Sequence, residues 1–283
     1  MKKFLVLSSW SRKAAIGSML IVAFAVVGCD DDDSWSPSAR PNDEPGVESS
    51  SSGVTPQSSD SETSVSTGTM TDSRDGQTYR TVKIGTQTWM AENLNYAYTG
   101  IPYNYDGSTS DSTSWCYDND PANCTKYGRL YTWAAAMDSV GKWSTNGKGC
   151  GYYKACYPTY PVRGVCPKGW HLPDSTEWNT LITTVGDKFT AGTALKSTSG
   201  WNDLGGESRN GTDAFGFSAL PAGYRRSDEY FFNEGYNADF WSSTEFDGDC
   251  AYSMHLDYFS GAFLSASYNS CMDDGFSVRC LKD

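Results

Sequence analysis

The first regular elements are predicted just after Asp75-Gly76, where β-branched and aromatic residues begin to recur. Residues 78–84 have the composition of a strand, Gly85-Thr86 that of a tight turn, and residues 87–90 that of the returning strand. This pattern predicts a β-hairpin at the start of the folded part of the chain.

Two later stretches have the apolar spacing of helices. In the first, Leu130, Trp133, Ala134 and Met137 fall at i, i+3, i+4 and i+7, and Gly141 supplies a stop. The second opens at Asp174, which can cap free amides while Glu177 reaches back to complete a capping box. Its apolar stripe is Trp178, Leu181, Ile182 and Val185, and Gly186 ends it. We interpret both stripes as core positions.

Beyond Gly186 the pattern changes to strands and loops. Glycine-rich polar connections separate four apolar stretches, which predict strands at residues 215–220, 240–243, 251–256 and 276–281. The sequence therefore predicts an α+β domain over residues 73–283, with two main helices and short, mostly antiparallel strands. About 210 residues are enough for one domain with a substantial core.

Residues 29–72 have a different composition from the predicted domain. They are rich in Ser, Thr, Asp, Glu, Pro and Gly and contain few apolar residues. Such a segment buries too little apolar surface to offset the entropy lost on ordering. We therefore expect a disordered stalk, with order beginning near Asp75-Gly76.

Residues 1–28 have the organisation of a leader peptide. Lys2, Lys3, Arg12 and Lys13 precede an apolar stretch at residues 14–27, which is too short for a mature membrane span. The run Val26-Val27-Gly28-Cys29 then resembles a bacterial lipobox, which implies that Cys29 is acylated. An ordinary secretory signal and a transmembrane anchor are the alternatives. The resemblance implies a lipoprotein held in the bilayer through Cys29, in the outer membrane and exposed at the cell surface.

The chain is acidic and rich in aromatic residues. Its formal charge is −12 and becomes about −16 without the four positive charges of the leader. This argues against nucleic acid as a partner. Ten Trp and 18 Tyr suit either a β-rich core or a surface on which sugars stack.

The remaining eight cysteines predict disulfides. An even number in an exported domain implies a disulfide framework, and eight cysteines allow 105 connectivities. There are two histidines, and neither lies at ligand spacing from a cysteine, so a structural zinc site is not expected.

The C-terminal third resembles the closing pattern of C-type lectin-like domains. There Cys250 opens a predicted strand, Cys271 follows, and residues 276–279 lead into Cys280. The resemblance implies the pairs Cys250–Cys271 and Cys166–Cys280, which leaves Cys116–Cys124 and Cys150–Cys156 as local pairs.

A closer resemblance covers most of the predicted domain. Seven phrases occur in the order found in the Fibrobacter succinogenes major paralogous domain of exported bacterial proteins and lipoproteins, at residues 76–79, 89–94, 128–133, 166–173, 215–223, 241–245 and 277–280. That family has no established activity, so the resemblance bears on fold and location and leaves function open.

The same phrases are more weakly similar to the formylglycine-generating and sulfatase-modifying enzymes, which share the lectin-like fold. Those enzymes need reactive cysteines near a metal, and the even cysteine count leaves no obvious thiol for that role. An oxidase of this kind is the less favoured alternative, and we expect neither catalysis nor a cofactor.

Calcium is the remaining candidate metal. The chain has no Glu-Pro-Asn triplet, and Trp201-Asn202-Asp203 lies far upstream of Cys271, where a lectin calcium site would not use it. Glu245, Asp247 and Asp249 are weak candidate ligands because carboxylate oxygens suit calcium. A solvated acidic turn is the favoured interpretation.

A binding or adhesion role, with plant or cell-surface polysaccharide as ligand, is the function that we expect. Residues 224–239 are the candidate surface because aromatic faces stack on sugars while polar groups hydrogen-bond hydroxyls. The candidate residues are Tyr224, Arg225, Tyr230, Asn233, Tyr236, Asn237 and Asp239. Two alternatives remain: Phe231, Phe232 and Phe240 pack the loop onto the core, or the domain is a scaffold that binds another surface protein.

Overall fold

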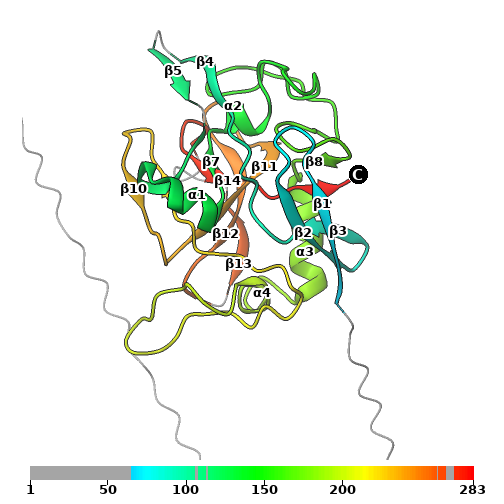
Figure 1. The fold of residues 1–283 in the computed structure, drawn as a ribbon, viewed down its shortest axis with the longest axis vertical. Helices are drawn as coiled ribbons and strands as arrows, with labels where there is room; N and C mark the ends of the chain where they lie inside the picture. Colours follow the sequence, from blue (N-terminus) through cyan, green and yellow to red (C-terminus); the bar gives the residue numbers. More distant parts are fainter. Residues whose placement is uncertain (1–64, 106–107, 113, 260, 266–270) are drawn as a thin grey trace, which may run out of the picture. The chain divides into compact units, whose positions relative to one another are not determined.

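Strands from both ends of the folded part of the chain form one sheet (Figure 1). The computed structural model describes residues 65–105, 108–112, 114–259, 261–265 and 271–283. Within these residues the first sheet has five strands, in the order β1-β2-β3-β15-β8. Their bounds are Ser66–Thr71, Thr78–Ile84, Gln87–Met90, Leu281–Lys282 and Trp170–His171. The predicted hairpin is confirmed as β2 and β3, with Val82 opposite Trp89.

A second sheet lies at the centre of the fold. Across the described ranges it has six strands, in the order β13-β12-β11-β14-β7-β6. Their bounds are Ala262–Ser265, Ala251–Leu256, Ala238–Glu245, Phe276–Ser277, Leu130–Tyr131 and Ser114–Trp115. The pairs are antiparallel except for β11 with β14, which is parallel.

Two short hairpins form two-stranded sheets of their own. They are β4 with β5, Thr99–Tyr105 and Ser108–Ser112, and β9 with β10, Tyr224–Arg225 and Phe231–Phe232. The helical elements are η1 Tyr117–Asn119, α1 Pro121–Tyr127, α2 Trp133–Ala136, α3 Ser175–Val185 and α4 Ala191–Leu195. The fold is therefore mixed α/β with few helices and mostly antiparallel strands.

Helix α3 forms as the sequence predicts. The Asp174 side chain accepts a hydrogen bond from the Glu177 amide, and the Glu177 side chain accepts one from the Asp174 amide. Trp178 and Leu181 are fully buried on its inner face. The capping box and the apolar stripe thus fix both the start and the orientation of the helix.

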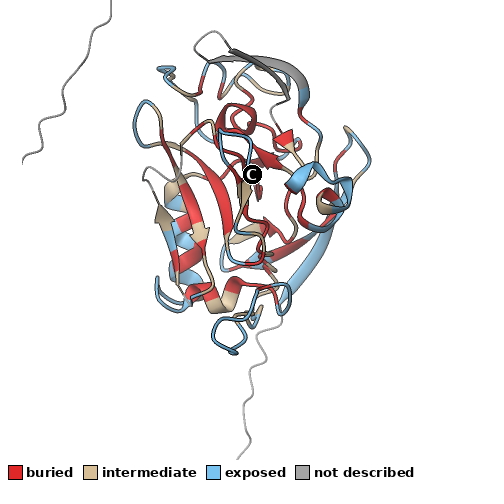
Figure 2. Cartoon of the chain, turned by 90° about the vertical axis from the view of Figure 1, so that its left-hand side faces the viewer, coloured by how far each residue is buried: buried red, intermediate tan, exposed pale blue. Residues whose placement is uncertain are grey.

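Aromatic side chains dominate the interior, where buried residues concentrate on the central strands (Figure 2). The indole of Trp178 lies 4.7 Å from that of Trp89 and 5.8 Å from the Phe240 ring. Trp241 stacks on Phe276 at 4.3 Å in the other half of the core. Much of the aromatic content is therefore packing and not ligand-binding surface.

Three of the four predicted disulfides are formed: Cys116–Cys124, Cys150–Cys156 and Cys166–Cys280. Cys250 and Cys271 are opposite each other in an isolated antiparallel bridge, and burial together with the neighbouring Cys271 raises the pKa of the Cys250 thiol. The structure therefore places the fourth pair side by side, and its bond stays a prediction.

Several predicted elements are wrong in extent. The first predicted helix is reduced to α2, because Leu130 belongs to strand β7 and the turn at Asp138 has a positive φ. Residues 215–220 form a turn with one bridge at Ala219, since Ser218 also has a positive φ. The predicted strand at residues 276–281 is divided between β14 and β15.

The start of the folded part also differs from the prediction. Strand β1 pairs along its whole length with β2, although its residues fall within the predicted stalk. Polar residues such as Thr69 and Thr71 form this strand because it lies at the edge of the sheet, where side chains stay exposed. Residues 29–64 of the predicted stalk, Cys29 and the leader lie outside the described residues.

Candidate functional site

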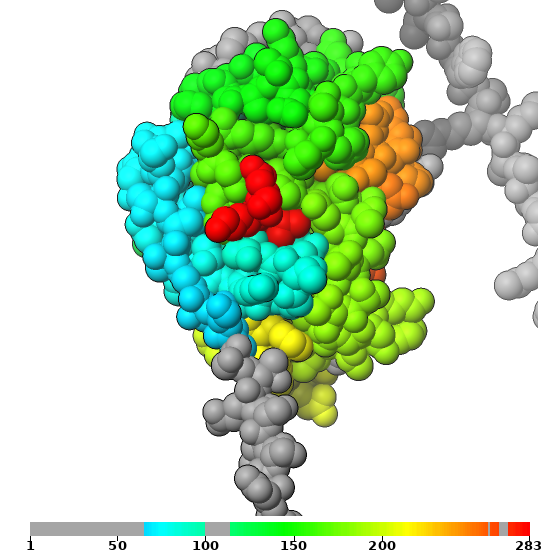
Figure 3. Space-filling model, turned by 90° about the vertical axis from the view of Figure 1, so that its right-hand side faces the viewer, coloured from blue at the N-terminus to red at the C-terminus, as the bar shows by residue number. Residues whose placement is uncertain are grey.

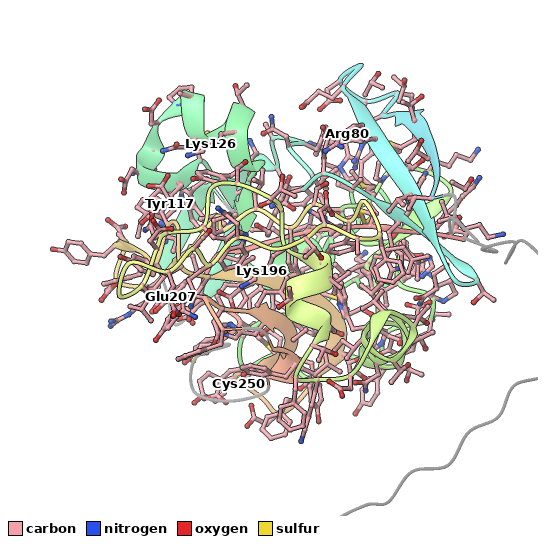
Figure 4. The ribbon with its side chains drawn as sticks, turned by 90° about the horizontal axis from the view of Figure 1, so that it is seen from below. Arg80, Tyr117, Lys126, Lys196, Glu207 and Cys250 are labelled. Atoms are coloured by element: carbon pink, nitrogen blue, oxygen red, sulfur yellow. A yellow bond between two sulfur atoms is a disulfide. The ribbon has the colours of Figure 1, made fainter. Side chains whose placement is uncertain are left out.

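A polar pocket opens between strand β2, helix α1 and the loops around residues 197 and 213–220. Its volume is about 360 Å³, within the range of small-molecule sites. In Figure 4, Arg80 on β2 and Lys126 on α1 lie on two separate sides of this region. Hydroxyl and amide groups provide much of the lining: Gln77, Thr78, Asn93, Asn95, Thr125, Ser197, Thr198 and Ser218.

Asn93 and Arg279 form a fixed part of the pocket wall. Arg279 Nε donates to Asn93 Oδ1 at 3.1 Å, and a second guanidinium nitrogen donates to the same oxygen at 2.5 Å. Another guanidinium nitrogen donates to the Phe217 carbonyl. Asn93 in turn donates to the Tyr127 carbonyl at 2.9 Å. Both side chains are buried, so these bonds hold four segments of the chain in one arrangement.

Gly128 allows helix α1 to end against this network. Its φ is +75°, which favours glycine, and a Cβ there would lie 2.8 Å from Asn93 Cβ and 2.9 Å from the Leu94 carbonyl oxygen. Only a residue without a side chain allows so close an approach. Gly128 therefore positions the α1 side of the pocket.

Charges of both signs surround the pocket. Burial lowers the pKa of Arg279, and its positive charge is met by carbonyl and amide oxygens. Near the opening, Arg80 Nε lies 3.2 Å from a Glu92 oxygen, and both side chains are substantially exposed. Asp213 accepts from the Ser218 amide at 2.6 Å. Such a site offers donors and acceptors in fixed directions, which suits a ligand with many hydroxyl groups.

Sequence reasoning did not find this pocket. Asn93 lies within the phrase at residues 89–94 and Arg279 within that at residues 277–280, but 186 positions separate them. The sequence offered one indication of the pocket: Arg279 stands between the apolar residues Val278 and Cys280, in a stretch expected to be buried.

The predicted surface at residues 224–239 is not a single loop. It contains β9, β10 and the start of β11. The guanidinium of Arg225 is stacked 4.0 Å from the Trp115 ring centroid, and Tyr224 stacks on Phe232 at 5.8 Å. Asp239 is buried, with Oδ1 2.6 Å from Nδ1 of His255. Tyr224, Arg225 and Asp239 are therefore engaged in contacts within the domain.

The other candidates in this segment are more accessible. Tyr230 is 69% exposed, and Tyr236 contacts Tyr258 edge-on at 6.1 Å. Asn233 is exposed with a positive φ, and the Asn237 amide donates to its carbonyl. The structure thus separates the predicted set into packed and exposed members.

The acidic turn between β11 and β12 is organised by its own backbone. Asp247 Oδ1 accepts from the Cys250 amide at 2.8 Å and the Asp249 amide at 3.3 Å. Asp247, Asp249 and Cys250 offer one ligand atom each within 4.8 Å of one another, a group that does not include Glu245. The backbone amides already occupy one Asp247 oxygen, an arrangement that fits the favoured interpretation of an acidic turn; calcium binding by these weak candidates is not tested.

Comparison with known protein families agrees with the resemblance seen in the sequence. The model of the Fibrobacter succinogenes major domain matches residues 82–282. The chain belongs to this family. No curated protein and no solved structure matches it.

The match to the Fibrobacter succinogenes major domain includes Asn93, Gly128 and Arg279, so the fixed part of the pocket lies inside the family domain. Arg80 and strand β1 precede the matched residues. No helix in the part of the chain that the structure describes is both long and apolar enough to cross a membrane.

Proposed function

We propose that the chain is a cell-surface lipoprotein whose folded domain binds carbohydrate without catalysis. The observation that carries this proposal is the polar pocket: hydroxyls, amides and paired charges line a cavity of about 360 Å³ with a rigid wall. A saccharide ring carries hydroxyl groups in fixed directions, and such a lining can satisfy them in pairs. Preorganised donors and acceptors reduce the entropy cost of binding.

The lectin-like fold is part of the same proposal. The bond between Cys166 and Cys280 agrees with the frame that the lectin resemblance implies, and so does the side-by-side placement of Cys250 and Cys271. Lectin-like domains accommodate many ligands on one scaffold, so the fold leaves the ligand to be argued from the site.

Anchoring through Cys29 gives the domain its location. The mature protein should carry acyl chains on an N-terminal Cys29, because two or more chains hold a protein stably in a bilayer. Intact-mass measurement of the purified protein detects these groups directly. Release of the wild-type protein without detergent, or membrane retention of Cys29→Ala, would contradict this assignment.

Binding is tested with the full chain in detergent on an array of oligosaccharides, followed by calorimetry with the best ligand. The paired variant Glu92→Gln with Lys126→Ala removes charge from the pocket opening, and both side chains are more than one-third exposed. Loss of hydrogen bonds to charged groups should weaken binding by about 10–100-fold.

Lys83→Ala provides the matched control, because Lys83 is exposed on the same strand as Arg80 but does not line the pocket. It should bind as the wild type does. Equal binding by the pocket variant and the wild type would place the ligand elsewhere. Capture of a protein by cross-linking on cells, with no glycan bound, would favour the scaffold alternative.

A further inference from the structure

Four exposed aromatic rings lie on two segments that are distant in sequence. Tyr153, Tyr157 and Tyr160 are 61%, 94% and 49% exposed, and Phe246 is 50% exposed. Isolated exposed aromatics are common, but a group of them marks an interaction surface. We call these four residues the aromatic track.

Contacts along both segments show that they run side by side. The Tyr153 amide donates to the Gly248 carbonyl at 2.7 Å. Farther along, Cys156 Sγ lies 3.9 Å from a Glu245 oxygen. Figure 3 shows orange surface, the colour of residues near 250, next to green surface, the colour of residues near 150.

The far end of the track is also held. The Tyr160 hydroxyl donates to the Ser243 carbonyl at 3.4 Å. Residue 153 is therefore opposite residue 248 and residue 160 opposite residue 243, so the segments are antiparallel. Phe246 lies between these two ends in the sequence of its own segment. Tyr153 and Tyr160 are thus near opposite ends of the paired segments.

Two of the tyrosines are anchored without being buried. The Tyr153 hydroxyl lies 3.3 Å from an Asp249 oxygen, and the Cys150–Cys156 disulfide closes the loop around Tyr153. The Thr159 amide donates to the Asn146 carbonyl at 2.9 Å, which fixes the loop next to Tyr160. Rings fixed in this way lose little conformational freedom on binding a ligand.

The charge of this surface restricts the ligand. Glu245, Asp247 and Asp249 accompany the track, with Lys154 as an exposed positive charge on the facing loop. Carboxylates accept hydrogen bonds from hydroxyls, and they repel anionic polymers. The C–H faces of sugar rings stack on aromatic faces. An uncharged chain of sugars satisfies all three conditions.

We propose that the aromatic track binds a neutral polysaccharide along its length, as a second site separate from the polar pocket. The proposal rests on the proposed carbohydrate-binding function but does not require a ligand in the pocket.

The test uses the full chain in detergent and four neutral polysaccharides: microcrystalline cellulose, xylan, mixed-linkage glucan and starch. Polygalacturonate serves as the anionic comparison. Tyr153→Ala with Tyr160→Ala should weaken binding to at least one neutral polymer by about tenfold or more, and polygalacturonate should not bind at the track.

Three further variants separate binding from folding. Tyr157→Ala removes a ring that is 94% exposed, so it should weaken binding without changing the melting temperature. Tyr153→Phe keeps the ring and should retain binding. Phe189→Ala removes a ring that is 68% exposed and lies outside the track, and it should leave binding unchanged.

The outcomes distinguish the two sites. Polymer binding that is lost in the track variant but kept in the Glu92→Gln, Lys126→Ala variant supports the track. Polymer binding lost only in the pocket variant would overturn the track and leave the proposed function standing. Absence of binding to all four polymers, or a basic peptide as the sole ligand, would also overturn the track.

Discussion

Both histidines lie on β-strands, His171 on β8 and His255 on β12, and each contacts acidic side chains. His171 Nε2 lies 2.9 Å from a Glu177 oxygen and Nδ1 2.8 Å from an Asp283 oxygen. Burial lowers the pKa of His171, but the hydrogen bonds to these two carboxylates outweigh it and the net pKa is raised. Burial likewise opposes the attraction of Asp239 for His255, whose pKa is also raised.

These two histidines should make stability depend on pH. A raised pKa means that the folded state holds protons that the unfolded state releases above about pH 6.5. The contribution of the two histidines to the free energy of unfolding should therefore be fully present below that pH and fall as the pH rises through their folded-state pKa values. Denaturant unfolding between about pH 5.5 and 8.5 measures this slope, and the double variant His171→Gln, His255→Gln should flatten it. An unchanged slope in that variant would contradict the assignment.

Lys196 has a lowered pKa, in contrast to the raised pKa values of the two histidines. Its Nζ donates to the carbonyls of Asp257 and Phe259 and lies 4.7 Å from the Trp201 ring centroid, and burial lowers its pKa to about 8. Between about pH 8 and 10.4 the unfolded state holds the proton and the folded state does not. The wild type should therefore gain up to about 3 kcal/mol over this range relative to Lys196→Met. The measurement is the free energy of unfolding of both proteins at several pH values in this range. A constant difference between them would show that Lys196 does not titrate there.

Among the elements, helix α3 was predicted correctly because its signals are local. The cap, the reciprocal Glu177 bond and the apolar stripe all lie within 12 residues. The helix predicted around α2 was too long and the strand predicted at residues 215–220 was wrong, because Asp138 and Ser218 adopt positive φ values that cannot be inferred from their residue types. Strand β1 was missed because an edge strand with exposed Thr residues has no apolar pattern.

The cap of α3 can be measured separately from the rest of the helix. Asp174→Ala removes the acceptor for the Glu177 amide and should cost about 0.5–2 kcal/mol of unfolding free energy. Asn179→Ala, an exposed substitution in the same helix, is the control and should be within about 0.5 kcal/mol of the wild type. A larger effect of Asn179→Ala than of Asp174→Ala would show that the cap is not the stabilising feature.

At the scale of the whole molecule, the disulfides differ in how much chain they enclose. Cys166 and Cys280 are 114 residues apart, whereas Cys116 and Cys124 are eight apart. The resemblance predicted these pairs correctly, but it did not predict the pocket, which needs Asn93 and Arg279 to meet from opposite ends of the domain. A resemblance to known sequences can indicate which cysteines pair. It does not indicate which distant side chains meet to form a pocket, because that depends on the full three-dimensional arrangement.

The long bridge should therefore stabilise the domain more than the short one. Loss of loop-closure entropy predicts a cost of about 5 kcal/mol for Cys166→Ala with Cys280→Ala, against about 2.5 kcal/mol for Cys116→Ala with Cys124→Ala. Urea unfolding of both variants under non-reducing conditions gives the comparison. A greater loss from the short bridge would show that packing around it, and not loop length, determines its contribution.

The position of β15 has a consequence for how the protein is made. Leu281 pairs with Trp89 on one side and with His171 on the other, so a two-residue strand joins the halves of the first sheet. A nascent chain that has left the ribosome only as far as residue 270 has β3 and β8 but nothing between them. The first sheet therefore closes only once residues 281–282 have been synthesised, well after the β2–β3 hairpin at its other end.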